Sequence, residues 1–248
     1  MSKPFKVALI TGAGRRIGAE IAHTLHAAGI NVVLHYNHSA AEAKRLCTIL
    51  NEQRPHSAVL TQCDLLKMDQ LELLVKEAAH AWGHLDILIN NAAKFYKTPI
   101  YRATEANWDD LINCNLKAPF FLAQLASHYI NPQHGCIINI TDIHGERPMQ
   151  DYPIYCISKA ALTMMTKALA KELGPHIRVN AVSPGTVMWP EGDNMLTEKQ
   201  REIIINKTSL HRHGTAKDVA RAVLFLVKDA DFVTGQVITV DGGRSLST

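Results

Sequence analysis

The chain has 248 residues, a formal net charge of +3 and 47% apolar residues. This composition is that of a globular protein and excludes wholesale disorder. The charge is too small to indicate a nucleic-acid partner, and the length suits one α/β domain over residues 1–248. The N-terminus lacks a long apolar segment typical of a secretion signal, and the run Ala222 to Val227 is far too short to span a membrane. We therefore expect a cytoplasmic protein with no membrane or nucleic-acid partner.

Cysteine and histidine usage indicates neither a disulfide framework nor a metal site. The five cysteines are an odd number and include no C-x-x-C pair, so we expect reduced thiols. The 13 histidines include no H-E-x-x-H motif and no other zinc-ligand spacing. We predict no bound metal.

Short apolar runs alternate with amphipathic segments along almost the whole chain. The apolar runs are typical of strands buried on both faces of a parallel sheet. We predict strands at residues 6–11, 31–36, 58–63, 86–90, 135–141, 177–183 and 236–240. Helical periodicity is found over residues 16–28, 39–53, 68–82, 104–130, 152–173 and 216–228. The alternation predicts an α/β fold, a single-domain, Rossmann-like, doubly wound parallel sheet of about seven strands with helices on both faces.

The stretch 184–215 is the least strand-like part of the chain. It follows a predicted strand end, which is where doubly wound sheets bind ligands. We predict that it forms a substrate-covering flap containing a short helix.

A glycine-rich turn, TGAGRRIG (Thr11 to Gly18), follows the first strand and opens the first helix. Gly12 allows a tight turn and the close approach of a phosphate, Gly18 allows the helix to pack closely on the strand, and the helix N-terminus offers free N–H groups to a pyrophosphate. The strand–turn–helix context is the one that a dinucleotide-binding motif requires.

The end of the second strand favours NADP over NAD. An NAD site usually has an acidic residue there, but this chain has His35-Tyr36-Asn37-His38-Ser39 and no acid before Glu42. A 2′-phosphate is bound by arginine, hydroxyl and amide donors, and Arg15 and Arg16 lie in the nearby turn.

Tyr155 and Lys159 are four residues apart in a predicted helix and therefore share one face. An ammonium group stabilises a nearby phenolate, so we expect Lys159 to lower the pKa of Tyr155 and to make the pair an acid/base near neutral pH.

Taken in order, TGAGRRIG, Asp64-Leu65, NNAA (Asn90 to Ala93), Asn115, Tyr155-x3-Lys159, Ser183-Pro184-Gly185 and VDGG resemble the short-chain dehydrogenase/reductase family over essentially the whole chain. The resemblance implies that Tyr155 passes the proton, that Lys159 holds the nicotinamide ribose, and that Asn115 supports a proton path through water. Together with the turn, it implies these cofactor-binding residues: Gly12, Arg15, Arg16, Ile17, Gly18, His35, Tyr36, Asn37, His38, Ser39, Asp64, Leu65, Asn91, Ala92, Ala93, Tyr155, Lys159, Pro184, Gly185 and Val187.

Two positions depart from the usual pattern of this family. Arg16 replaces a glycine of the turn, and Asp142 stands 13 residues before Tyr155, where the family has a catalytic serine. A serine hydroxyl can donate to the oxygen of a ketone under reduction, whereas a carboxylate would repel the charge that develops there. A carboxyl group can instead relay a proton to a nitrogen or hold a cationic heterocycle.

Both departures resemble the pteridine reductase branch of the family, as do HYNHSAAEA (His35 to Ala43), NNAAKFYKTP (Asn90 to Pro99) and the closing DGGRSL. This resemblance implies that Phe95 stacks on a pterin and that Arg16 faces it. Trp189 is a candidate for the far wall of the pocket. The implied substrate-binding residues are Arg16, Phe95, Asp142, Tyr155 and Trp189, and the implied catalytic residues are Asn115, Asp142, Tyr155 and Lys159.

The sequence therefore favours NADPH-dependent reduction of a pterin, with dihydropterin to tetrahydropterin as the main step and oxidised pterin or dihydrofolate as further substrates. Two alternatives stay open: a carbonyl or 3-oxoacyl reductase of the same family, and a non-catalytic NADP-binding protein. Family analogy implies a homotetramer built through the helices at 104–130 and 152–173.

Overall fold

The computed structural model describes residues 5–132, 135–189 and 195–247. Its centre is one sheet of seven parallel strands in the order β3-β2-β1-β4-β5-β6-β7. All seven predicted strands are confirmed to within one residue at each end. The strands are β1 (Val7–Ile10), β2 (Asn31–Tyr36), β3 (Ala58–Gln62), β4 (Ile87–Asn90), β5 (Gly135–Ile140), β6 (Ile177–Pro184) and β7 (Val237–Val240).

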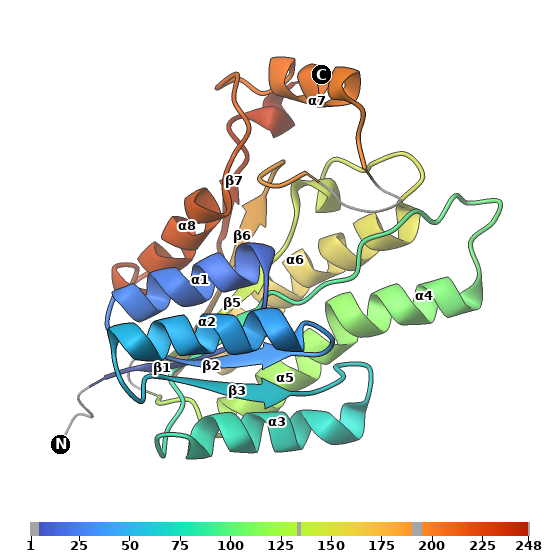
Figure 1. Ribbon diagram of the computed structural model, residues 1–248. Helices are drawn as coiled ribbons and strands as arrows, with labels where there is room; N and C mark the ends of the chain where they lie inside the picture. Colours follow the sequence, from blue (N-terminus) through green and yellow to red (C-terminus); the bar gives the residue numbers. More distant parts are fainter. Residues whose placement is uncertain (1–4, 133–134, 190–194, 248) are drawn as a thin grey trace.

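Helices cover both faces of the sheet (Figure 1). One face carries α1 (Arg16–Ala27), α2 (Ala40–Gln53) and α8 (Ala216–Lys228), and the other carries α3 (Met68–His80), α5 (Ala118–Ser127) and α6 (Pro153–Leu173). Two further helices, α4 (Glu105–Ile112) and α7 (Glu198–Asn206), lie toward the carboxyl ends of the strands. The short helix α7 falls within residues 184–215, where a helix was predicted.

The alternation of side chains along each strand builds two separate cores. In β1, Ala8 and Ile10 pack with α1, α2 and α8, whereas Val7 and Leu9 pack with α3, α5 and α6. All four side chains are fully buried. Burial on both faces explains why this strand is continuously apolar, as parallel strands between two helix layers generally are.

The segment predicted as one helix over 104–130 is instead divided. Between α4 and α5 the chain forms a π-helical turn, Asn113–Lys117, and Pro119 follows at the start of α5. Proline has no N–H to donate to the carbonyl four residues earlier, so an uninterrupted α-helix is disfavoured there. The wider turn leaves Asn115 buried at the inner side of the helix pair.

The five cysteines are free thiols, four of them buried and Cys47 half-buried. Among the described residues, no helix is both long and apolar enough to cross a membrane. The same residues contain no group of three or more His, Cys, Asp or Glu side chains placed to hold a metal ion.

His35 links three strands from inside the fold. Its ring is buried at the end of β2, and its Nδ1 accepts a hydrogen bond from the Gly12 amide, with 3.2 Å between the two nitrogens. Its Nε2 lies 3.0 Å from the Cys63 carbonyl oxygen, just after β3. Burial lowers the pKa of His35 to about 4, although the Cys63 carbonyl and the charge of Asp64 act in the opposite direction.

The burial of His35 predicts a loss of stability in mild acid. In the unfolded chain the imidazole binds a proton near pH 6.5, whereas in the folded chain it does so only near pH 4. The unfolded state therefore binds more protons in this window, and the free energy of unfolding falls as the pH drops from about 6.5 to about 4, by roughly 3 kcal/mol at most. Urea titrations of wild type and His35→Asn across this range measure the difference.

The variant should have the shallower pH dependence. His26, whose pKa burial and the nearby charge of Arg54 also lower to about 4, is present in both proteins and cancels in the comparison. Equal pH dependence in the two proteins would contradict the assignment.

Candidate functional site

The candidate site lies at the carboxyl edge of the sheet, where the strand order reverses. From β1 the chain proceeds outward to β2 and β3, and it then returns to place β4 on the other side of β1. The turn after β1 and the segment after β4 consequently face each other. In doubly wound sheets this crevice is the usual ligand site.

Thr11 and Asn91 join the two segments. The Thr11 hydroxyl donates to the Ile89 carbonyl at 3.2 Å and accepts hydrogen bonds from the amides of Asn91 and Ala92, both at 3.0 Å. The Asn91 side chain donates to the carbonyls of Thr11 at 2.8 Å and Gly12 at 3.2 Å. Asn91, predicted as a cofactor residue, therefore also fixes the shape of the turn.

Glycine is required at two positions of the turn. Gly12 has φ +64, and a Cβ there would lie 3.1 Å from the Ala92 Cα. A Cβ on Gly18 would lie 2.2 Å from the Gly12 carbonyl oxygen. The helix start and the turn thus pack at a distance that no other residue permits.

The start of α1 fits a bound anion such as a pyrophosphate. Within the described chain, no side chain caps this helix end, and its first turn carries no acid. The free amides of a helix N-terminus and the positive end of its dipole favour an anion. Arg15 is exposed beside this end, and Ile17 packs partly buried against the core below it.

Further residues predicted to bind the cofactor line the neighbouring edge, at the ends of β2 and β3. The Asn37 amide donates to Asp64 Oδ1 at 3.3 Å, and Leu65 and Tyr36 are buried. Ser39 lies against the turn, because a Cβ on Gly14 would meet its hydroxyl oxygen at 2.4 Å. His38 is exposed, while Ala93, also exposed, follows Asn91 on the other side of the crevice.

Tyr155 and Lys159 lie one turn apart on α6, as predicted, and both are buried. The Tyr155 hydroxyl donates to Asp142 Oδ2 at 2.7 Å. The other oxygen of Asp142 accepts from the His144 amide at 2.9 Å and thereby starts a short 3-10 helix after β5. Lys159 Nζ donates to the Ile140 carbonyl at 2.9 Å and lies 5.8 Å from the centroid of the Tyr155 ring.

The expectation that Lys159 lowers the pKa of Tyr155 is wrong for this structure. Burial raises the pKa of Tyr155 well above its usual range, and the adjacent carboxylate of Asp142 raises it further. Burial lowers the pKa of Lys159, against an opposing effect of Asp142. The reason is geometric: the phenol donates to an anion, whereas the ammonium donates to a backbone carbonyl. At neutral pH the phenol stays protonated.

Asn115 reaches the site from the π-helical turn. Its side chain makes a two-way pair with the backbone of Lys94, accepting from the amide at 2.8 Å and donating to the carbonyl at 3.0 Å. It also donates to the Ser158 hydroxyl at 3.1 Å. Asn115 therefore holds the segment after β4 against α6.

Phe95 lies beside Tyr155, at the end of that segment. Its ring stacks on Tyr152 with centroids 4.8 Å apart and contacts Tyr155 edge-on at the same separation. Tyr152 and Ser158 were missed from the sequence, although both belong to the same stretch as Tyr155 and Lys159. Lys94 was missed as well, and it forms an ion pair with Asp110 on α4.

Arg16 connects the glycine turn to the segment after β6. Its φ of +56 is unusual for a side-chain-bearing residue, and its Nη2 donates to the Trp189 carbonyl at 3.1 Å. The Trp189 ring stacks on His213 at 4.4 Å and lies 5.3 Å from the Arg201 guanidinium of α7. Gly185 and buried Val187 lead from β6 toward Trp189, directly after Pro184.

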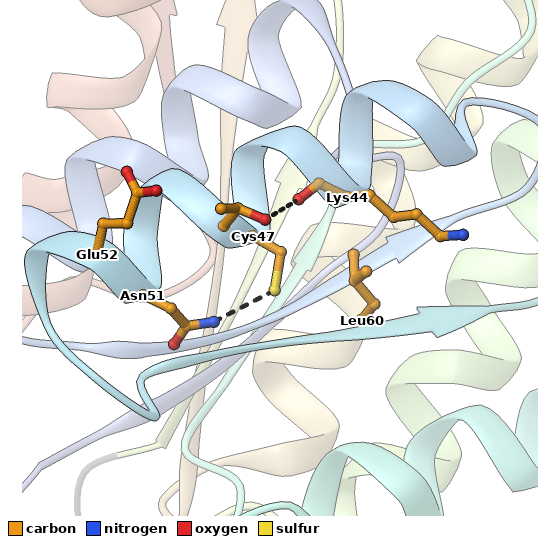
Figure 2. A pocket seen from close by; sticks show the side chains of 6 residues that line it. Lys44, Cys47, Asn51, Glu52 and Leu60 are labelled. Carbon is orange, nitrogen blue, oxygen red and sulfur yellow. Dashed lines mark hydrogen bonds between the residues drawn. The ribbon is translucent and has the colours of Figure 1, made fainter.

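A separate hollow of about 550 Å³ lies between α2 and β3 (Figure 2). It is lined by Lys44, Cys47, Thr48, Asn51, Glu52 and Leu60. The Cys47 thiol is held by the Asn51 amide at 3.4 Å, and burial raises its pKa. None of these lining residues belongs to the crevice described above.

Comparisons with known proteins agree with this geometry. A family model described as "Enoyl-(Acyl carrier protein) reductase" matches residues 12–245. The chain is 35% identical to "Pteridine reductase 1" of Leishmania tarentolae over 281 residues, which cover 97% of this chain and 96% of that protein. It is 34% identical to a 3-oxoacyl-[acyl-carrier-protein] reductase of Staphylococcus aureus over 244 residues, 97% of this chain and 98% of that protein.

A protein of Picea abies named "Short-chain type dehydrogenase/reductase" is 34% identical over 250 residues, 96% of this chain and 92% of its own length. The family model spans the turn from Gly12 to Gly18, the tyrosine–lysine pair and most of the closing segment. The chain therefore belongs to the short-chain dehydrogenase/reductase family of oxidoreductases.

Proposed function

We propose that the protein is an NADPH-dependent pterin reductase that reduces a C=N bond by hydride transfer and protonates a ring nitrogen. The observation that carries the proposal is the hydrogen bond from the Tyr155 hydroxyl to Asp142. Similarity to a pteridine reductase supports it, but the similarity to 3-oxoacyl reductases is nearly equal. The choice between them therefore depends on the chemistry of residue 142.

A carboxylate at residue 142 is poorly suited to ketone reduction. Negative charge grows on a ketone oxygen as it accepts hydride, and enzymes stabilise that charge with hydrogen-bond donors. Asp142 supplies two acceptor oxygens, one of them bound to Tyr155 and the other to the His144 amide. An alkoxide-like oxygen next to this group would be repelled.

The same pair suits protonation of a nitrogen. Burial and Asp142 raise the pKa of Tyr155, so the phenol holds its proton at neutral pH and can act as an acid. Asp142 is partly exposed and can exchange protons with solvent. A proton that enters at the carboxyl group can therefore reach the phenolic oxygen through the 2.7 Å hydrogen bond.

The nucleotide would supply the hydride when bound. The turn from Gly12 to Gly18 and the start of α1 would hold its pyrophosphate, and Lys159 would hold the nicotinamide ribose. Arg15, His38 and Ser39 would bind a 2′-phosphate, because no acidic side chain ends β2. Phe95 would present an aromatic surface to the pterin next to Tyr155.

A carbonyl or 3-oxoacyl reductase is the second candidate, favoured by the similarity to 3-oxoacyl reductases and by the tyrosine, lysine and asparagine that it would share. A homotetramer through α4, α5 and α6 stays part of the proposal. Apolar side chains are exposed on all three helices, at Trp108 of α4, at Phe120 and Phe121 of α5 and at Ile157 and Met164 of α6.

A substrate panel tests the proposal directly. We expect the protein to oxidise NADPH in the presence of 7,8-dihydropterins or dihydrofolate, and to oxidise little NADPH in the presence of ketones or an acetoacetyl thioester. The kcat/KM for NADPH should be higher than that for NADH. Absorbance at the nicotinamide band measures every reaction in the same way. Turnover of the thioester without turnover of any pterin would favour the second candidate. Nucleotide binding without turnover of any substrate would favour a non-catalytic protein.

Replacing Asp142 separates proton relay from a structural role. Asp142→Asn keeps the shape and removes the acid, and Asp142→Ser restores the usual residue of the family. Both changes should lower kcat for dihydropterin by roughly 10²–10⁴-fold if general acid catalysis is lost. Asp109→Asn, an exposed carboxylate on α4, is the matched control and should behave as wild type. Wild-type pterin rates in both Asp142 variants would reduce Asp142 to a loop residue.

Replacing Phe95 tests the aromatic contact with the substrate. Phe95→Ala should raise the KM for dihydropterin several-fold or more and leave the Kd for NADPH nearly unchanged, because a stacked ring contributes about 0.5–1.5 kcal/mol beyond its buried area. Steady-state kinetics and a nucleotide titration measure the two constants. Phe232→Ala removes a fully exposed ring as the control. An unchanged KM with a lower melting temperature would assign Phe95 to packing alone.

A further inference from the structure

His35 holds two consecutive amides of the glycine turn. Its ring Nδ1 accepts from the Gly12 amide at 3.2 Å, and its own carbonyl accepts from the Ala13 amide at 2.8 Å. The preceding amide, of Thr11, is bound to the Ile89 carbonyl at 3.0 Å. Three successive amides of the turn are thus directed into the scaffold.

The partners of the ring define its protonation state. A backbone amide can only donate, so Nδ1 must be the acceptor. The Cys63 carbonyl can only accept, and it lies 3.0 Å from Nε2, so Nε2 must carry the proton. Only the neutral Nε2–H tautomer satisfies both contacts, and the ring is 1% exposed, so water cannot replace either partner.

We infer that His35 is a positioning residue for the nucleotide: as the neutral Nε2–H tautomer it sets the shape of the turn through the Gly12 amide, and it does not contact the nucleotide itself. This inference rests on the proposed function for the statement that a nicotinamide nucleotide binds at the turn. This indirect role differs from the direct contact with the cofactor that the sequence led us to expect for His35.

Two substitutions divide the contacts of the ring. His35→Asn can place its amide oxygen near the former Nδ1 and keep an acceptor for the Gly12 amide. His35→Gln reaches the position of Nε2 and keeps a donor for the Cys63 carbonyl, but it leaves the Gly12 amide without its acceptor. If the Gly12 contact sets the turn, His35→Asn should bind nucleotide much better than His35→Gln, although each variant loses one hydrogen bond.

Nucleotide titration by fluorescence, together with thermal unfolding, provides the test. We expect the Kd for NADPH to stay within a few-fold of wild type in His35→Asn and to rise about tenfold or more in His35→Gln, since a buried donor without a partner is costly. The melting temperature should fall in both. His26→Gln is the matched control. His26 is a second buried histidine, it lies in the last turn of α1, far from the glycine turn, and it is hydrogen-bonded to Ser57. Its substitution should lower the melting temperature and leave the Kd for NADPH unchanged.

Long-range ¹H–¹⁵N spectra of the nucleotide-free wild type give a second measurement that needs no variant to fold. They should show His35 as the Nε2–H tautomer, unchanged between pH 8 and mildly acidic pH. An Nδ1–H tautomer or an imidazolium would overturn the inference, and so would equal Kd values for the two His35 variants when wild type binds NADPH. Failure of wild type to bind either NADPH or NADH would instead overturn the proposed function and the nucleotide part of this inference together.

Discussion

The parallel pairing of β1 with β4 is the constraint on which the site depends. It brings together two segments that are about 80 residues apart in the chain. The bonds among Thr11, Asn91 and Gly12 then hold those segments at a fixed spacing. The rest of the site is built outward from this junction: Phe95 continues from β4, Asp142 follows β5, and α6 packs against β6 and the 3-10 helix that begins after Asp142.

The pKa values of Tyr155 and Lys159 are shifted mainly by burial. A phenol, an ammonium and a carboxylate share a small volume, and each is directed to a different kind of partner. Because the phenol is buried and also faces the carboxylate, the proton is retained on the tyrosine. The lysine charge is partly satisfied by a backbone carbonyl.

The sequence predicted the strands well because fully buried parallel strands are continuously apolar, which is a local signal. It also placed Tyr155 and Lys159 on one helix face, since their spacing alone decides that. The division of 104–130 by a π-helical turn was not predictable from amphipathicity, because both halves keep the same apolar face. The raised pKa of Tyr155 depends on its burial and on its hydrogen bond to Asp142; the sequence indicated Asp142 as a site residue but neither of these two features. The inward bonds of His35 reach Gly12 and Cys63, which are 23 and 28 residues away in the chain, so no local pattern could reveal them.

The two cores on either side of the sheet have a consequence for how this sequence can change. Leu9 and Ile10 are neighbours in the chain, but Leu9 belongs to the layer of α3, α5 and α6 and Ile10 to the layer of α1, α2 and α8. A change of volume at one of them can be compensated only by residues of its own layer, because the sheet backbone separates the two. Adjacent positions in a strand can therefore change volume independently of each other, while positions far apart in the chain, such as Ile10 and Val223, share the limited volume of one layer.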